Sequence, residues 1–216
     1  MTERPSGWEL LAAVELMDRL RRDGPWEREQ THESLRRYLV EETYELLDAI
    51  DSGDRDHLLE ELGDILLQVL FHARIAADRS GDPFDIDDVA RAFTTKISAR
   101  TQGVLSGNDI DLQTQLEEWE TRKAAEKARG SVLDGIATGQ PALALAQKVL
   151  ERLAAAGFPD DLVPDAVRSV RVVADGPSVE DALRAAVLQF MADIRIAEAA
   201  GPAPRTSEFW RTNLPR

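Results

Sequence analysis

The sequence predicts an all-α protein built around an antiparallel helical bundle. Apolar residues recur at helical spacings of three, four and seven along almost the whole chain. No two segments alternate in the way that a pair of neighbouring strands would. Glycine and proline divide the periodic stretches from one another. The helices are expected at 7–22, 33–51, 55–79, 85–101, 110–128, 141–156, 164–174 and 179–199.

The residues at the ends of these stretches support the limits. Gly24 ends the first helix, and Gly53 separates the second from the third. Asp85 follows a Gly-Asp-Pro turn and can cap the fourth helix with its carboxylate. Ser178 begins an S-x-x-D capping box at the start of the last helix. Residues 201–216 contain three prolines and are expected to be irregular.

The second expected helix, 33–51, carries glutamates on its apolar face. Glu42 interrupts the leucine stripe of that face, and Glu45 follows one turn later. Glu41 lies four residues before Glu45 and can therefore edge the same pocket. Three carboxylates are thus expected along one side of this helix.

The third expected helix is apolar on nearly every side, which is typical of a central, buried helix. Its polar exceptions form one line of Glu61, Asp64, Gln68 and His72. Buried polar groups need partners. In an antiparallel pair with the preceding helix, Glu61 and Asp64 would face the glutamates of 33–51. His72 is interpreted foremost as a hydrogen-bonded core residue.

Carboxylates gathered in an apolar setting repel one another and lose hydration. A bound divalent cation is the simplest way to stabilise them. Helical acids without a D-x-D-x-D-G loop favour Mg²⁺ over Ca²⁺, with Mn²⁺ as an alternative ion. The competing interpretation is an ordinary solvated acidic surface. Five acids on the apolar faces of two adjacent helices favour the metal site.

An internal repeat indicates a second, degenerate copy of this region. Residues 67–76 resemble residues 188–197, which lie 121 positions later. At the same offset Glu61 becomes Ala182, Asp64 becomes Ala185, and no E-E-x-x-E motif precedes them. The second half is therefore expected to be a degenerate helical copy without metal ligands.

Composition limits the class of function. The chain has 216 residues, 43% of them hydrophobic, and a net charge of −14. Such an acidic surface disfavours binding to nucleic acid backbones. The absence of cysteine excludes disulfides and thiol catalysis. The N-terminus does not resemble a signal peptide, and no apolar stretch is long enough to span a membrane. We therefore expect a cytoplasmic protein that binds no membrane.

The pattern E-E-x-x-E followed by E-x-x-D resembles the MazG family of nucleoside triphosphate pyrophosphohydrolases. The resemblance extends to the entry segment at 17–31, the EEWETRK segment near 119 and the connector at 131–149. In all it covers about residues 8–158. It implies a MazG-type helical bundle that hydrolyses a nucleoside triphosphate to the monophosphate and pyrophosphate. The family's usual H-P-H-V-F continuation is replaced here by residues 101–105, TQGVL.

The resemblance also implies roles for individual side chains. Glu41 would bind a second ion or orient the attacking water. Independently of the resemblance, the Trp26 indole can either stack on a base or pack its loop onto the bundle. The implied metal ligands are Glu42, Glu45, Glu61 and Asp64, which with Glu41 form the catalytic set. The implied phosphate-binding cations are Lys96, Arg100 and Lys123, and the competing interpretation of each is an ordinary surface cation.

The expected domains are a catalytic helical domain at 1–128, a connector at 129–140, the degenerate half at 141–200 and the irregular tail at 201–216. The apolar helix pair that carries the acids predicts a homodimer. The expected activity is Mg²⁺-dependent hydrolysis of a nucleoside triphosphate, and family resemblance adds removal of non-canonical nucleotides. The alternatives are a phosphoribosyl-ATP pyrophosphohydrolase, a nucleotide-sensing or partner-binding protein, and a helical scaffold without a ligand.

Overall fold

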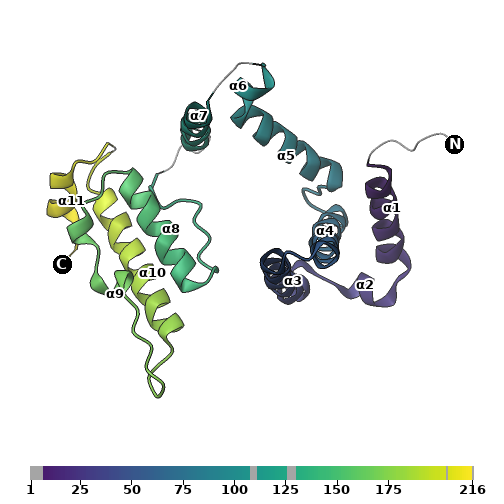
Figure 1. Cartoon of the computed structure of the whole chain (residues 1–216), viewed down its shortest axis with the longest axis horizontal. Coiled ribbons are helices and arrows are strands. Elements are labelled where there is room, and N and C mark those ends of the chain that lie inside the picture. Colours follow the sequence, from purple (N-terminus) through teal and green to yellow (C-terminus); the bar gives the residue numbers. More distant parts are fainter. Residues whose placement is uncertain (1–6, 108–110, 126–129, 203, 216) are drawn as a thin grey trace. The chain divides into compact units, whose positions relative to one another are not determined.

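The computed structural model describes residues 7–107, 111–125, 130–202 and 204–215, and these residues contain helices and no strand (Figure 1). This confirms the all-α class. The chain divides into two compact units, residues 1–123 and 124–216. Within the described ranges, no helix is both long enough and apolar enough to cross a membrane.

The first unit is organised around an antiparallel pair of long helices, α3 and α4, which Figure 1 shows side by side. The shorter helix α1 also packs on α4. The helices of this unit are α1 (Trp8–Asp23), α2 (Pro25–Glu29), α3 (His32–Ser52), α4 (Arg55–Ala77), α5 (Ile86–Arg100), α6 (Gln102–Leu105) and α7 (Leu112–Ala125).

Local capping fixes the α3–α4 hairpin. Thr31 and Ser34 form a reciprocal capping box at the start of α3, with contacts of 3.1 and 2.9 Å between side chain and backbone. Gly53 ends α3 in the left-handed conformation, with φ of 67°, where a side chain would add strain. Asp54 then caps α4 by accepting hydrogen bonds from the backbone N–H groups of residues 56 and 57. This short connection makes the two helices antiparallel neighbours.

An ion-pair network joins α1 to α4. The Arg74 guanidinium donates to Asp18 on α1 at 2.8 Å and also pairs with Asp78 at the end of α4. Arg21 on α1 donates to the Asp78 carboxylate at 2.9 Å. These pairs flank a small core formed by Met17, Leu35, Leu70, Phe71 and Ile75.

The sequence predicts a central helix buried on all sides, and this expectation is wrong for α4 in the single chain. Leu59 is 60% exposed and Leu62 is 50% exposed. On the neighbouring helix α3, Leu47 is 50% exposed and Ile50 is 55% exposed. The reason is that α4 packs mainly against α3 and, less extensively, against α1 and α5, which leaves part of its apolar surface uncovered.

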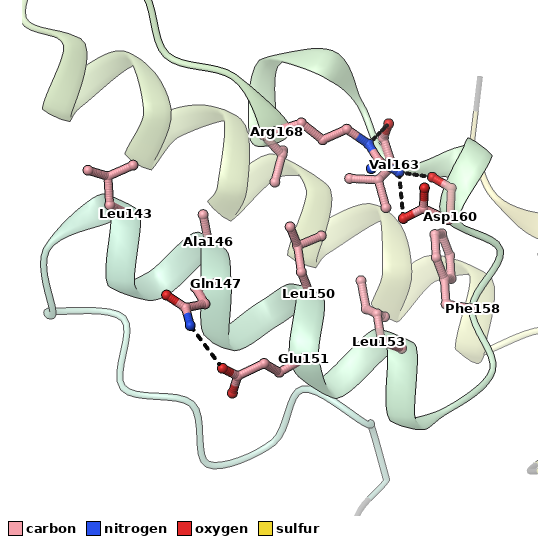
Figure 2. Close-up of a pocket in the computed structure, with 12 residues that line it drawn as sticks. Leu143, Ala146, Gln147, Leu150, Glu151, Leu153, Phe158, Asp160, Val163 and Arg168 are labelled. Carbon is pink, nitrogen blue, oxygen red and sulfur yellow. Dashed lines mark hydrogen bonds and ion pairs between the residues drawn. The ribbon is translucent and has the colours of Figure 1, made fainter.

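The second unit is built on the packing of α8 against α10. Its fully buried side chains include Leu145, Val149, Val187 and Ile194. A pocket of about 560 Å³ lies beside α8, with an apolar floor and with Arg168 paired to Asp160 at 2.9 Å on its rim (Figure 2). The elements of this unit are α8 (Ala142–Ala155), the 3-10 turn η1 (Asp160–Leu162), α9 (Asp165–Arg168), α10 (Val179–Glu198) and α11 (Ser207–Asn213).

Two expectations for the second unit are wrong. Residues 207–213 of the supposedly irregular tail form α11, because Thr206 caps the helix and Trp210 is completely buried. The helix expected at 164–174 ends at Arg168, where Ser169 turns to extended backbone. The β-branched valines that follow are poor helix formers and explain the early end. The prediction that 141–200 is a degenerate copy of the first unit stays a prediction.

Candidate metal centre

The α3–α4 pair brings three of the predicted ligands together. Glu42 and Glu45 lie one turn apart on α3, and Glu61 comes from α4. Each offers one carboxylate oxygen, and these three oxygens lie within 4.8 Å of one another. Capping at 53–54 sets this register, because it aligns the middle of α3 with the first half of α4.

Glu61 is the most deeply placed of these acids. It is 7% exposed, and its Oε2 is buried without a hydrogen-bond partner among the described residues. Burial raises the pKa of Glu61, and the charge of Glu45 adds to that rise. A buried carboxylate oxygen without a donor is costly, and a cation would satisfy it.

Glu42 is strongly affected by the same crowding. Burial is the largest cause that raises its pKa to about 7, followed by a hydrogen bond with Glu45 and by the charges of Asp64, Glu45 and Glu41. A divalent cation bound between these carboxylates would take the place of a proton and relieve their repulsion.

Asp64 and Glu41 border the cluster. Asp64 lies one turn after Glu61 on α4, and its charge raises the pKa of both Glu42 and Glu61. Asp64 does not contribute one of the three oxygens that converge within 4.8 Å. Glu41 is exposed, and its charge contributes to the raised pKa of Glu42. The structure therefore places all five predicted acids in one region, with three converging and two adjoining.

Sequence reasoning overlooked His57. Its Nε2 lies 3.4 Å from Glu61 Oε1, one turn earlier on α4. The signal was available, because a spacing of four residues puts two side chains on the same face of a helix. His32 and His72 form a second unexpected contact, with their Nδ1 atoms 2.8 Å apart and their rings stacked at 5.1 Å.

The cations predicted to bind phosphate are placed differently from one another. Lys96 lies exposed on α5. The Arg100 guanidinium is buried and sits 5.2 Å from the centre of the Trp119 ring, so that it contacts α7. The Lys123 side chain lies outside the described residues. Lys96 and Arg100 both lie on α5, whereas the acids lie on α3 and α4, and their phosphate-binding role stays a prediction.

Trp26 lies on α2 with about half of its surface exposed. Its ring packs edge-on against Tyr38 on α3, at 6.2 Å, and against Phe71 on α4, at 5.9 Å. It therefore attaches the α2 segment to the bundle, as the packing interpretation predicts. Its exposed part leaves base stacking open as a prediction.

The donor set fits a hard divalent cation. Glu42, Glu45 and Glu61 supply only carboxylate oxygens, which suit Mg²⁺ or Mn²⁺ better than softer metals. The unpartnered Oε2 of Glu61 and the raised pKa of Glu42 are both features that such an ion would relieve. Fold and site together define an all-helical protein with a carboxylate centre on an antiparallel helix pair.

The chain is similar in sequence to known proteins. Residues 30–105, which include α3 and α4, match the MazG nucleotide pyrophosphohydrolase domain. The chain is 58% identical over 209 residues to the nucleoside triphosphate pyrophosphohydrolase of Mycolicibacterium smegmatis, covering 95% of this chain and 64% of that protein. It is 60% identical over 194 residues to the protein of the same name from Mycobacterium tuberculosis, covering 90% and 59%. A 26.1 kDa Streptomyces cacaoi protein is 46% identical over 202 residues, covering 89% and 84%.

The chain belongs to the MazG family. The match with the domain contains every predicted acid of the centre, from Glu41 to Asp64. The chain spans about three fifths of the length of the mycobacterial relatives that it matches.

Proposed function

We propose that this protein is a Mg²⁺-dependent nucleoside triphosphate pyrophosphohydrolase. It would hydrolyse the bond between the α- and β-phosphates of an NTP or dNTP to give a nucleoside monophosphate and pyrophosphate. The observation that carries the proposal is the convergence of carboxylate oxygens of Glu42, Glu45 and Glu61 within 4.8 Å of one another. Glu61 also has a buried oxygen without a hydrogen-bond partner among the described residues. The names of the mycobacterial relatives support it.

The roles of the side chains follow from their positions. Glu42, Glu45 and Glu61 would hold the ion, and Asp64, on the next turn of α4, would complete its ligands. Bound there, Mg²⁺ would offset the negative charge of the phosphates and would lower the pKa of the attacking water. Glu41 stands at the exposed edge of the cluster, where it would orient the attacking water or bind a second ion. No nucleophilic side chain is required.

The substrate's negative charge has to be balanced outside the acidic cluster. Lys96, Arg100 and Lys123 are the proposed partners of the phosphate oxygens. Removing Lys96 would raise KM or lower kcat while leaving the carboxylates intact, because Lys96 lies on a different helix from the acids. We further propose that the enzyme acts in the cytoplasm on non-canonical nucleotides.

We also propose that the chain works as a homodimer. Several large apolar residues of α3 and α4 are at least half exposed in the single chain, among them Leu47, Ile50, Leu59 and Leu62. Apolar exposure gathered on one helix pair is typical of an interface. A second copy would cover them with a matching apolar face.

The test is a pyrophosphate-release assay on a panel of ordinary and modified NTPs and dNTPs, with phosphoribosyl-ATP included. The wild type and Glu42→Ala are compared with and without Mg²⁺, and free phosphate is measured in parallel. We expect Mg²⁺-dependent pyrophosphate release that falls at least about 100-fold in Glu42→Ala, since metal ligands dominate such sites. Full activity in the variant would refute the site. Nucleotide binding without turnover in the folded wild type would identify a sensor instead.

A further inference from the structure

A line of buried polar atoms continues from the acidic cluster along α4. In the described part of the first unit, the buried side-chain atoms without a hydrogen-bond partner are Glu61 Oε2, Gln68 Oε1 and His72 Nε2. All three residues belong to α4, at positions 61, 68 and 72, and share one face of the helix. Orphaned polar atoms are rare in folded proteins, so three on one helix face indicate a missing ligand.

The line is as long as a nucleotide requires. At about 1.5 Å per helical residue, Gln68 lies about 10 Å and His72 about 16 Å along the helix axis from Glu61. If the phosphates lie at the acids, the sugar and the base of an extended nucleoside triphosphate fall beside Gln68 and His72.

The chemistry of the two side chains suits a neutral polar ligand. Gln68 is 4% exposed and carries no charge, so its carboxamide can pair with a hydroxyl or an amide group. Burial and the neighbouring His32 lower the pKa of His72, which keeps its imidazole neutral near pH 7. Its Nδ1 contacts His32 at 2.8 Å, so Nε2 is the ring nitrogen left for a further partner.

An aromatic wall stands next to this part of the line. Phe71, the residue before His72, contacts the half-exposed Trp26 edge-on at 5.9 Å. Tyr38 contacts the same indole from α3 at 6.2 Å. An apolar ring surface beside neutral hydrogen-bonding groups is the usual composition of a pocket for a nucleobase or sugar.

We propose that Gln68 and His72 form the subsite that recognises the nucleoside part of the substrate, while the acids hold its phosphates. This inference rests on the proposed function, because it places the phosphates at Glu42, Glu45 and Glu61. Gln68 Oε1 accepts a hydrogen bond from the sugar or base, and His72 Nε2 bonds farther along the line. Because Oε1 is buried in the free chain, the nucleoside must displace the side chains that cover it as it binds.

The matched variants are Gln68→Leu, which removes the hydrogen bonds at similar size, and Gln189→Leu in the second unit. Gln189 occupies the corresponding position of the internal repeat, is exposed and donates a hydrogen bond to Asp193 at 2.9 Å. His72→Phe tests the other side chain with an apolar ring. Circular dichroism confirms that each variant is folded.

Binding is measured by calorimetry with non-hydrolysable α,β-methylene NTP analogues and, separately, with inorganic tripolyphosphate, both in Mg²⁺. We expect Gln68→Leu and His72→Phe to weaken analogue binding at least about tenfold, as the loss of a buried hydrogen bond would. Tripolyphosphate binding should stay within twofold of the wild type, because this ligand has no nucleoside. Gln189→Leu should match the wild type for both ligands.

Equal analogue binding by the wild type and both variants would overturn the nucleoside subsite. A parallel loss of tripolyphosphate binding would also overturn it, since the variants would then be disturbing the phosphate end. A wild type that binds the analogue in a Gln68-dependent way but releases no pyrophosphate would refute the proposed activity and leave the subsite standing. A wild type that binds neither ligand would refute both.

Discussion

At the scale of single residues, burial and mutual repulsion of the clustered acids favour the binding of a cation. Glu61 keeps a buried oxygen without a donor, and burial raises the pKa of both Glu61 and Glu42. The same features destabilise the metal-free chain. An ion that binds the folded protein at this site stabilises the folded state, and the stabilisation grows with the ion concentration.

The raised pKa of Glu42 gives a prediction for the pH dependence of stability. Without metal, the native Glu42 titrates at about 7, whereas its ordinary value is 4.5. The native state therefore binds more protons than the unfolded state between these values, and the free energy of unfolding falls as pH rises from about 4.5 to 7. Denaturation in EDTA across this range measures it.

The control for this prediction is Glu42→Gln, which cannot titrate. Its unfolding free energy should decline less over the same pH range than that of the wild type, and Mg²⁺ should stabilise the wild type more as pH rises, because the ion competes with the proton. Parallel pH profiles for the two proteins would show that Glu42 is not the titrating group.

At the scale of elements, the short helix α11 joins the core of the second unit through one side chain. Trp210 is fully buried and contacts Phe158 at 5.2 Å between ring centres. The ion pair of Arg205 with Glu198, both almost completely buried, holds the segment before α11 against the end of α10. Glu198 also accepts a hydrogen bond from the Val132 N–H at 3.0 Å, so three segments meet there.

We expect Trp210→Ala to lower the free energy of unfolding of the second unit by about 3–5 kcal/mol, because it removes a large buried side chain and leaves a cavity. Thr212→Ala, an exposed change in the same helix, should alter it by less than about 0.5 kcal/mol. Chemical denaturation followed by far-UV circular dichroism, which reports helix content, measures the free energy of unfolding of both variants. A loss below about 1 kcal/mol for Trp210→Ala would mean that α11 is not part of the core.

At the scale of the whole molecule, the first unit leaves more apolar surface open than its sequence pattern predicts. The helix pair α3–α4 was expected to be buried, and its exposed leucines are the part of that expectation which the single chain does not meet. A partner surface would reconcile the pattern with the structure.

The dimer proposal predicts that Leu59→Arg converts a wild-type dimer into a monomer in sedimentation velocity, because it places a charge in an apolar interface. Leu59 is 60% exposed in the single chain, so the variant should still fold. Val172→Arg, at a 77% exposed apolar residue of the second unit, is the matched control and should leave the dimer intact. A monomeric wild type, or a dimeric Leu59→Arg protein, would contradict the proposal.

Local sequence patterns were enough to predict much of the fold and of the acidic centre. The spacing of Glu42, Glu45 and Glu61 on two helices joined by Gly53 and Asp54 was enough to predict their convergence, since helical geometry and a short turn fix the register. The stacking of Arg100 on Trp119 was not predictable, because it depends on how separate helices pack.

The helix of the tail shows the same limit. Its prolines indicated irregular chain, whereas burial of Trp210 in a distant core decided the outcome. The His32–His72 contact joins residues forty positions apart and likewise has no local signal. Periodicity predicts which elements exist, and long-range packing decides which side chains meet.

The central claim is that the carboxylates of α3 and α4 bind a divalent cation. The most direct test is calorimetric titration of Mg²⁺, and of Mn²⁺ with spectroscopic detection, into the metal-free wild type and into Glu61→Gln. The amide is close in size to the carboxylate but carries no charge, so the fold should persist while binding weakens at least about tenfold. Equal affinity of the two proteins for the ion, or no binding by the wild type, would contradict the account.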